Sequence, residues 1–401
     1  MQCSGLIIGL LRRRGAAWLL WGASIAALPA KAQDVHNPDV LFDVSDDEMD
    51  TPIGVVADVA VRDSIVYLLD RQAFQVRRIT LAGSVLEAMG QFGEGPGDLS
   101  TPERLSLLSD GRCIVFQTFG GRAVCFGHDG RACEMLDLSP LKDGYASVIW
   151  LRVVPRESEQ VLVSLLTTSR PVKTLQESFE NSGTSASVKR MDLATGHLQT
   201  LFSTDEAEKQ EDTVSIPPEL YTFVIHGWDI NRSGTMLYAD TGGAYRVVIG
   251  HPVDGGSRAI DLPQQDGDED RLHSLAKKMN MPGSAILPRI ASVRWLDDHR
   301  FVVKPTADVP PAAAANSAGT YEVFDSDGSS FGRFDIRCGY DPNNDQLYLC
   351  GDILVVVRGV QAVARSAYRD VMAQSQTGQI EGAAPVEEVR VAAYRLFSSL
   401  H

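Results

Sequence analysis

Short strand-like segments recur along this chain from residue 55 onward, each bounded by Gly, Asp or Asn. They alternate β-branched or aromatic residues with other types, a period of two that is typical of β-strands. Examples are DSIVYLLD, GRCIVFQT, EQVLVSLL, GTMLYAD, HRFVVKP and GDILVVV. Helical periodicity is confined to a few inserted stretches. The pattern predicts an all-β chain, which can be a barrel, a sandwich or a propeller.

An internal repeat separates these three architectures. An apolar residue, a few turn residues and a glycine that opens the next strand recur at five places, ending at Gly83, Gly130, Gly196, Gly255 and Gly328. Glycine suits a hairpin position that needs a positive φ, which explains its recurrence. A tyrosine and an aspartate, followed later by an arginine, precede two of these turns: Tyr67 to Asp70 with Arg77, and Tyr238 to Asp240 with Arg246.

Each repeat unit contains four strands, which we call A to D. Strand B is predicted at residues 64–70, 112–118, 159–167, 234–240, 299–304 and 352–358, which makes six units. The third strand of the last unit, 389–397, runs almost to residue 401, while residues 40–44 near the other end are strand-like. We therefore predict a six-bladed β-propeller of four-stranded antiparallel blades over residues 33–401, a single domain whose ring is closed by the N-terminal strand.

One segment resembles a known repeat. YLLDRQAFQVRRITLAGSVLEAMGQFGEGPGDLSTPERL is similar to an NHL-type repeat, with a Tyr-x-x-Asp strand, an arginine-containing strand and a glycine-rich corner in that order. Its corner, residues 93–99, looks like that of exported bacterial six-bladed propellers related to NHL repeats. The resemblance is close over residues 52–137 and fades afterwards. It implies the fold and says little about function.

The glycine-rich stretch GQFGEGPGDL, residues 90–99, also raises the question of a phosphate-binding loop. It lacks the Gly-Lys-Ser/Thr ending of such loops, and Asp98 breaks the GxGxxG spacing. Glu94 and Asp98 would repel phosphate. The stretch is therefore predicted to be the corner that joins blade one to blade two.

The first 32 residues have the pattern of a signal peptide. Arg12 to Arg14 precede an apolar run, and Ala30-Lys31-Ala32 fits the small-x-small cleavage rule, with Gln33 as the new N-terminus. The run is shorter than the ~20 residues of a membrane span. An uncleaved signal anchor is the alternative, and the arginines also permit twin-arginine export. We expect an exported protein, periplasmic or extracellular, with no stable membrane span after cleavage.

The charge of the chain limits its partners. Cleavage would lower the formal net charge from −15 to −19, because it removes four basic residues (Arg12, Arg13, Arg14 and Lys31) and no acidic one. Such a charge repels nucleic acid and anionic lipid, so neither is an expected partner.

Five cysteines would remain after cleavage: Cys113, Cys125, Cys133, Cys338 and Cys350. None has the CxxC spacing of zinc or redox sites. Cys125 and Cys133 are symmetric about a turn and can face each other across a hairpin, and Cys338 and Cys350 are a second candidate pair. Buried thiols packed as small apolar residues are the other interpretation. The connectivity stays open.

In a propeller the A–B and C–D turns lie on one face, and the B–C and D–A connections lie on the other. The long segments all belong to the second face: 168–186, 203–220, 263–288, 305–318 and 359–388. Residues 268–279 and 360–372 have helical periodicity, and predict small helices that either cover the rim or form a lid or docking surface. Long loops gathered on one rim usually carry binding.

Five residues at or near the starts of A strands are candidate ligand or partner contacts: Arg104, His226, Trp228, Arg289 and Trp295. They would converge on the mouth of the axial channel. Blade packing is the alternative for the tryptophans. Ion pairs with neighbouring acids such as Asp98 or Glu103 are the alternative for the arginines.

No catalytic residues and no metal ligands can be assigned. Related propellers include lactonases and lyases with an axial metal, but three histidine ligands cannot be assembled from this chain. A calcium site with Glu103 or Asp229 is compatible with carboxylate chemistry but has no supporting spacing, so no cofactor is expected. The favoured function is a non-catalytic binding or scaffolding propeller for a peptide, glycan or protein partner. The alternative is a metal-dependent lactonase- or lyase-type hydrolase.

Overall fold

The computed structural model describes residues 34–117, 121–138, 147–157, 159–168, 184–205, 214–215, 223–241, 243–250, 256–263, 269–270, 272–274, 288–306, 316–361 and 388–397. The chain divides into two compact units: unit 1 contains residues 1–36 and 139–336, and unit 2 contains residues 37–138 and 337–401. Among the described residues each unit holds three blade sheets, and unit 2 also holds a two-stranded sheet. The fold is an all-β six-bladed propeller of mostly four-stranded antiparallel blades.

Unit 2 contains blades one, two and six. Blade one consists of β3 (Val56–Arg62), β4 (Ile65–Asp70), β5 (Gln75–Thr80) and β6 (Val85–Met89). Blade two consists of β9 (Pro102–Leu107), β10 (Cys113–Gln117), β11 (Arg122–Phe126) and β12 (Ala132–Asp137). Blade six consists of β26 (Gln346–Cys350), β27 (Ile353–Arg358), β28 (Arg390–Arg395) and β2 (Asp39–Ser45). A two-stranded parallel ribbon of β7 (Gln91–Phe92) and β8 (Asp98–Leu99) lies between β6 and β9 in the sequence.

Unit 1 contains blades three, four and five. Blade three consists of β13 (Ser147–Glu157), β14 (Gln160–Thr168), β15 (Thr184–Asp192), β16 (Leu198–Ser203) and β17 (Val214–Ser215). Blade four consists of β18 (Trp228–Ile230), β19 (Met236–Ala239), β20 (Arg246–Gly250) and β21 (Arg258–Asp261). Blade five consists of β22 (Ile290–Trp295), β23 (Arg300–Pro305), β24 (Asn316–Asp325), β25 (Ser330–Tyr340) and β1 (Asp34–His36).

The repeat pattern of the sequence is confirmed strand by strand. The six predicted B strands correspond to β4, β10, β14, β19, β23 and β27, each within two residues of the expected bounds. The repeat glycines among the described residues have the positive φ that their hairpins require: Gly83, Gly130, Gly196 and Gly328. The β3–β4 turn also needs positive φ values but contains no glycine: Asp63 and Ser64 have φ values of 49° and 62°.

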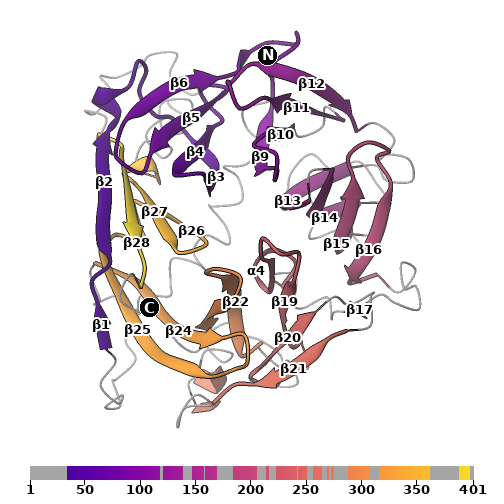
Figure 1. The fold of residues 1–401 in the computed structure, drawn as a ribbon, viewed down its shortest axis with the longest axis vertical. Helices are drawn as coiled ribbons and strands as arrows, with labels where there is room; N and C mark the ends of the chain where they lie inside the picture. The colour runs from indigo at the N-terminus through magenta and orange to yellow at the C-terminus, as the bar shows by residue number, and fades with distance from the viewer. Residues whose placement is uncertain are drawn as a thin grey trace, which may run out of the picture. The chain divides into compact units, whose positions relative to one another are not determined.

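The N-terminal strand completes blade six, as predicted. β2 is the neighbour of β28 in an antiparallel pair that joins Val44 to Val391 and Phe42 to Ala393. Figure 1 shows the long indigo β2 beside the yellow β28. Phe42 and Val44 are buried, whereas Val40 on the same strand is 64% exposed. The prediction did not include β1, which adds a parallel fifth strand to blade five by pairing Val35 with Asp335.

The B strand of blade one is apolar on both faces because this blade packs between blades six and two. In β4, Val66 and Leu68 belong to a core cluster shared with blade six. Tyr67 and Leu69, which point the opposite way, belong to a cluster shared with blade two. Successive side chains of a strand alternate between its faces, so two-sided burial produces the continuous run IVYLL rather than an apolar-polar alternation.

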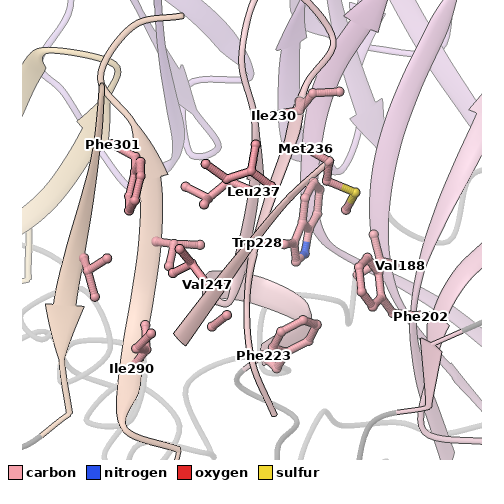
Figure 2. Close-up of a cluster of buried hydrophobic side chains, with 14 of the residues drawn as sticks. Val188, Phe202, Phe223, Trp228, Ile230, Met236, Leu237, Val247, Ile290 and Phe301 are labelled. Carbon is pink, nitrogen blue, oxygen red and sulfur yellow. The ribbon is translucent and has the colours of Figure 1, made fainter. Parts of the chain in front are cut away.

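The core of unit 1 is one large cluster that spans blades three to five. Figure 2 shows Trp228 in the middle of it, near Met236 and Leu237, with Phe223 and Phe202 beside it. The rings of Phe202 and Phe223 meet edge to face at a centroid separation of 5.4 Å. Aromatic side chains fill the wedge between these sheets.

The Tyr-x-x-Asp and arginine signature of blade one forms a buried ion pair. Arg77 Nε donates to Asp70 Oδ2 at 3.0 Å, and the two side chains are 5% and 0% exposed. The same carboxylate accepts the Gly54 amide at 3.0 Å, while the guanidinium donates to the Thr51 carbonyl at 2.7 Å and the Pro52 carbonyl at 2.8 Å. The pair therefore fastens the chain that enters blade one. The matching pair of blade four, Asp240 and Arg246, is 3.6 Å apart and more exposed.

The predicted helical insertions, 268–279 and 360–372, lie mostly outside the described residues. Residues 269–270, 272–274 and 360–361 of these segments are helical. Two further short elements are described: the 3₁₀ turn η2 (Asp46–Glu48) after β2, and the helix α4 (Phe223–His226) before β18. Ser45 caps η2 by accepting a hydrogen bond from the Asp47 amide at 3.1 Å. None of the helices among the described residues is long and apolar enough to cross a membrane.

Candidate functional site

The glycine-rich stretch forms a compact corner between blades one and two. Gly95, Pro96, Gly97 and Asp98 make a tight turn in which the Asp98 amide donates to the Gly95 carbonyl at 3.0 Å. Gly97 has a φ of 84° directly after the proline, the arrangement of a type II turn. A Cβ on Gly93 would lie 2.2 Å from Asp98 Oδ2, so this glycine is needed for the close approach of the carboxylate.

Hydrogen bonds hold the corner in one conformation. Asp98 accepts from the Gly95 amide at 2.8 Å and from the Gln91 side chain at 3.0 Å. Both hydrogen bonds lower the pKa of Asp98 because they favour the charged carboxylate, and the bond from Gln91 has the larger effect. Arg122 of β11 donates to the Gly93 and Glu94 carbonyls at 3.3 Å and 3.2 Å. The acids that argue against a phosphate loop are thus structural parts of the turn.

The corner displays an aromatic pair. Phe92 is 68% exposed, and its ring lies 4.8 Å from the ring of Phe74 between centroids. Phe74 ends the β4–β5 turn with a φ of 58°, a rare value for a bulky residue. Such strained residues tend to cluster at functional sites. We call residues 71–74 and 91–104 the corner surface.

Charged side chains continue the corner surface toward the A strand of blade two. Arg71, in the turn that contains Phe74, pairs with Glu103 at 3.2 Å. The neighbouring Arg104 donates to the Glu103 carbonyl at 2.6 Å and to the Ala57 carbonyl of β3 at 3.4 Å. The predicted contact residue Arg104 therefore joins two adjacent A strands through its guanidinium.

The same two hydrogen bonds join adjacent A strands at two boundaries between blades, and we call this pair of contacts the latch. Asp58 of β3 accepts from the Leu105 amide of β9 at 3.0 Å, while Arg104 reaches back to the residue before Asp58. In unit 1, Asp229 of β18 accepts from the Trp295 amide of β22 at 2.8 Å, and Arg294 donates to the Trp228 carbonyl at 3.3 Å. The same two backbone-directed contacts thus join blade one to two and blade four to five.

The latch was missed by sequence reasoning. Its sequence signal is an aspartate-ending dipeptide in one A strand and an arginine-beginning dipeptide in the next. These are Ala57-Asp58 with Arg104-Leu105, and Trp228-Asp229 with Arg294-Trp295. The spacing between the two halves differs between blades because the D–A connections differ in length. A fixed-period search therefore does not align them.

A second cation strengthens the latch in unit 1. Arg152 of β13 pairs with Asp229 at 2.6 Å, donates to the Trp228 carbonyl, and lies 4.7 Å from the centre of the Trp228 ring. Arg294 also donates to the His226 carbonyl at 3.1 Å, and its guanidinium is 3.3 Å from His226 Nδ1. Arg152, Arg294 and His226 thus lie close to the Trp228-Asp229 dipeptide in unit 1.

The five predicted contact residues have different surroundings. Trp228 and Trp295 are 0% and 4% exposed, so both side chains pack in the core. His226 is exposed at the end of α4. Arg289 donates to the Gly243 carbonyl at 2.8 Å and to the Glu269 carboxylate at 2.7 Å. In unit 1 the structure brings His226 and the two tryptophans to adjacent A strands, while Arg289 pairs with an acid as the alternative interpretation expected.

The carboxylates considered for calcium are engaged by arginine. Glu103 pairs with Arg71, and Asp229 pairs with Arg152 and accepts a backbone amide. Within the described ranges, no group of three or more His, Cys, Asp and Glu side chains is arranged to hold a metal ion. A small cavity of about 10 Å³ lies between α4, β19 and β22, lined by Phe223, Gly227, Ala239, Asp240, Thr241, Pro288, Ile290 and Ala291. Its volume suits about one water molecule.

The fold and these contacts define a six-bladed β-propeller. No family model matches the chain, and no curated protein sequence matches it. Among solved structures it is similar to virginiamycin B lyase from Staphylococcus aureus, with 8% identity, a TM-score of 0.40, and coverage of 88% of this chain and 99% of the other. It is also similar to a putative exported protein from Bacteroides fragilis, with 11% identity, a TM-score of 0.38, and coverage of 93% and 94%.

A further similar structure is a luciferin-regenerating enzyme, with 10% identity, a TM-score of 0.41, and coverage of 89% of this chain and 96% of the other. The propeller fold is shared by lyases, by lactonase-like enzymes and by binding scaffolds. At these identities and TM-scores the similarities carry no argument about activity. The function must therefore be argued from the described residues.

Proposed function

We propose that the chain is an exported, non-catalytic binding or scaffolding propeller, related to NHL-repeat proteins, that recognises a peptide, glycan or protein partner. The observation that carries the proposal is the exposed Phe92 ring, packed at a tilt against Phe74 at a corner whose backbone is held by hydrogen bonds. A rigid exposed aromatic side chain offers a large contact area at a small entropic cost. The acids and arginines beside it supply a polar rim of the kind found around binding surfaces.

The connections between strands support the same face. The A–B turns between described strands are short, from Asp63–Ser64 in blade one to residues 108–112 in blade two. The B–C connections of blades three, five and six are longer, at 169–183, 306–315 and 359–389, whereas that of blade one is only 71–74. Phe74 and Phe92 belong to the B–C turn and the D–A connection of blade one. The aromatic pair therefore belongs to the same classes of connection, B–C and D–A, as the long segments of the other blades.

The predicted contact residues keep separate roles in this proposal. Arg104 belongs to the corner surface and contributes a cation beside Glu103 in unit 2. His226 and Arg289 are candidate partner contacts of unit 1. Trp228 and Trp295 support that region from the core and do not touch the partner.

Photo-crosslinking tests the binding face. A photoreactive phenylalanine analogue at position 92 is expected to give a discrete adduct in the source cells, because this ring is 68% exposed on the proposed face. The matched control is the same analogue at position 331, where the native phenylalanine is 41% exposed beside the C–D turn of blade five. Adducts are read by gel shift and mass spectrometry, and protease or glycosidase treatment identifies the class of partner.

The Phe92→Ala variant completes this test. It should fold as the parent does, since the side chain is exposed, and should lose co-purification of the crosslinked partner, whereas Phe331→Ala should keep it. Adducts at position 331 together with none at position 92 would show that the wrong face was chosen.

The alternative, a metal-dependent lactonase- or lyase-type hydrolase, makes a different prediction. Purified protein would then carry stoichiometric calcium or zinc, and a chelator would lower its melting temperature. Metal content near zero with an unchanged melting temperature favours the binding propeller.

Export is a separate part of the proposal. Cleavage after Ala32 is expected to leave Gln33 as the N-terminus, because Ala30 and Ala32 are the small residues of the cleavage rule. The intact mass of protein recovered from the periplasm or the medium checks this. Recovery of the chain with residues 1–32 still attached would overturn it.

A further inference from the structure

Two cysteines meet on the outer hairpin of blade two. Cys125 lies on β11 and Cys133 on β12, and residues 127–131 form the turn between these strands. The ladder pairs Cys125 with Glu134 and Phe126 with Ala132, with a bulge at this point. Cys133 is the additional residue of the bulge: it lies between Ala132, which pairs with Phe126, and Glu134, which pairs with Cys125.

The two thiols are already in contact. Cys133 Sγ lies 3.0 Å from Cys125 Sγ and 3.4 Å from the Cys125 carbonyl oxygen. A disulfide needs an S–S distance of about 2.05 Å. Bond formation therefore needs an approach of the sulfur atoms by about 1 Å, without a change of strand register.

The two cysteines differ in access to solvent. Cys133 is exposed, and Cys125 is 0% exposed. Burial, followed by the hydrogen bond from Cys133, raises the pKa of Cys125 to about 12, which favours the protonated thiol in the reduced protein. A reagent in solution must therefore reach Cys133 first.

The other described cysteines have different surroundings. Cys113 and Cys338 are 1% and 6% exposed. The Cys350 thiol donates to the Val59 carbonyl at 3.6 Å. Among the residues that the structure describes, Cys125 and Cys133 are the two whose thiols are recorded in contact with each other.

We propose that Cys125 and Cys133 form a redox-reactive disulfide, with Cys133 as the attacking thiol and Cys125 as the resolving one. The oxidant is a small-molecule disulfide. Cys133 loses its proton and its thiolate attacks one sulfur, which breaks the S–S bond, releases the first small thiolate and leaves a mixed disulfide on Cys133. As the Cys125 sulfur attacks Cys133 Sγ, its proton passes to solvent and the second small thiolate leaves; the two released thiolates take up the two protons that the protein thiols lost. Two protein thiols are oxidised, and one disulfide is reduced to two thiols.

The β11–β12 hairpin also packs against the glycine-rich corner. Arg122 of β11 holds the Gly93 and Glu94 carbonyls, and a Cβ on Gly97 would meet the Ala132 Cβ of β12 at 2.8 Å. A covalent bond between β11 and β12 therefore ties together the two strands against which the corner packs. The proposed disulfide does not depend on the binding function proposed above, because it follows from the thiol geometry alone.

Oxidised glutathione provides the test. The full chain, purified in reductant and desalted, is treated with oxidised glutathione, alkylated under denaturing conditions and mapped by mass spectrometry. We expect the wild type to lose two alkylatable thiols and to give a peptide pair linked between Cys125 and Cys133. The Cys113→Ala variant, which changes a buried cysteine of the same blade, is expected to behave in the same way.

Two single variants separate the roles of the thiols. Cys125→Ser is expected to stop at one glutathione bound to Cys133, since the resolving thiol is gone, and Cys133→Ser to resist modification at Cys125. A wild-type protein that keeps both thiols, that stops at the Cys133 adduct, or that links either cysteine to a different one would overturn the proposal. Cys133 is exposed, so the serine at this position leaves the core unchanged.

Discussion

Replacing Arg77 with alanine is expected to lower the free energy of unfolding by about 3–5 kcal/mol, the typical cost of removing one partner of a buried ion pair. Asp70 would remain in the core with a charge that only the Gly54, Gln72 and Ala73 amides offset. The Thr51 and Pro52 carbonyls would lose the hydrogen bonds from Arg77 that hold the segment before β3 against blade one. Chemical denaturation followed by tryptophan fluorescence measures the effect.

Two controls make this result specific to the buried pair. Arg246→Ala removes the arginine of the corresponding pair in blade four, which is 3.6 Å long with an Arg246 side chain 38% exposed, and should cost less than about 1 kcal/mol. In the double variant Asp70→Leu with Arg77→Met, both charges are gone. Its cost should therefore be smaller than the sum of the single variants. Equal losses for Arg77→Ala and Arg246→Ala would contradict the structural role.

Phe42→Ala is expected to cost about 3–5 kcal/mol, because it opens a cavity where β2 packs on blade six. Val40→Ala on the same strand should change stability by less than about 0.5 kcal/mol, since Val40 is 64% exposed. Deletion of residues 34–45 should exceed the Phe42→Ala loss. It removes both buried apolar side chains of β2, exposes the edge of β28, and removes Asp43, which pairs with Arg358 and Arg390.

Melting temperature and urea unfolding of the deletion variant and the two alanine variants measure this series. A deletion variant that melts at the parent temperature would show that β2 does not complete blade six. Similar losses for Phe42→Ala and Val40→Ala would contradict the burial of Phe42 and the exposure of Val40 in this structure.

The strand rhythm was predictable because its causes are local. Gly83 and Gly130 mark hairpins that need a positive φ, and the runs IVYLL and CIVFQ mark strands buried on both faces. Neighbouring residues decide backbone conformation and alternation, so the six B strands could be placed from the sequence. The place of β2 could be inferred as well, since blade six lacked a strand and residues 40–44 had the right pattern.

The candidate sites were predictable only in part. The corner was recognised from its glycines, but its Phe74–Phe92 pair was not, because residue 74 follows one strand and residue 92 another. Arg104 was selected as a contact and proved to donate to Ala57. The facing of Cys125 and Cys133 was expected from the symmetry of their hairpin, whereas the bulge that places Cys133 beside its partner was not.

By itself, the sequence determined the fold class, the number of blades, the turns that need glycine and the strand that completes blade six. The tertiary structure alone decided which side chains meet across blades: Asp58 with the Leu105 amide, Asp229 with the Trp295 amide, and Arg77 with the chain around Thr51. The physical reason is the range of each interaction. Dihedral preferences and strand alternation act over a few residues, whereas these partners lie 26 to 66 residues apart and meet only after neighbouring sheets have packed.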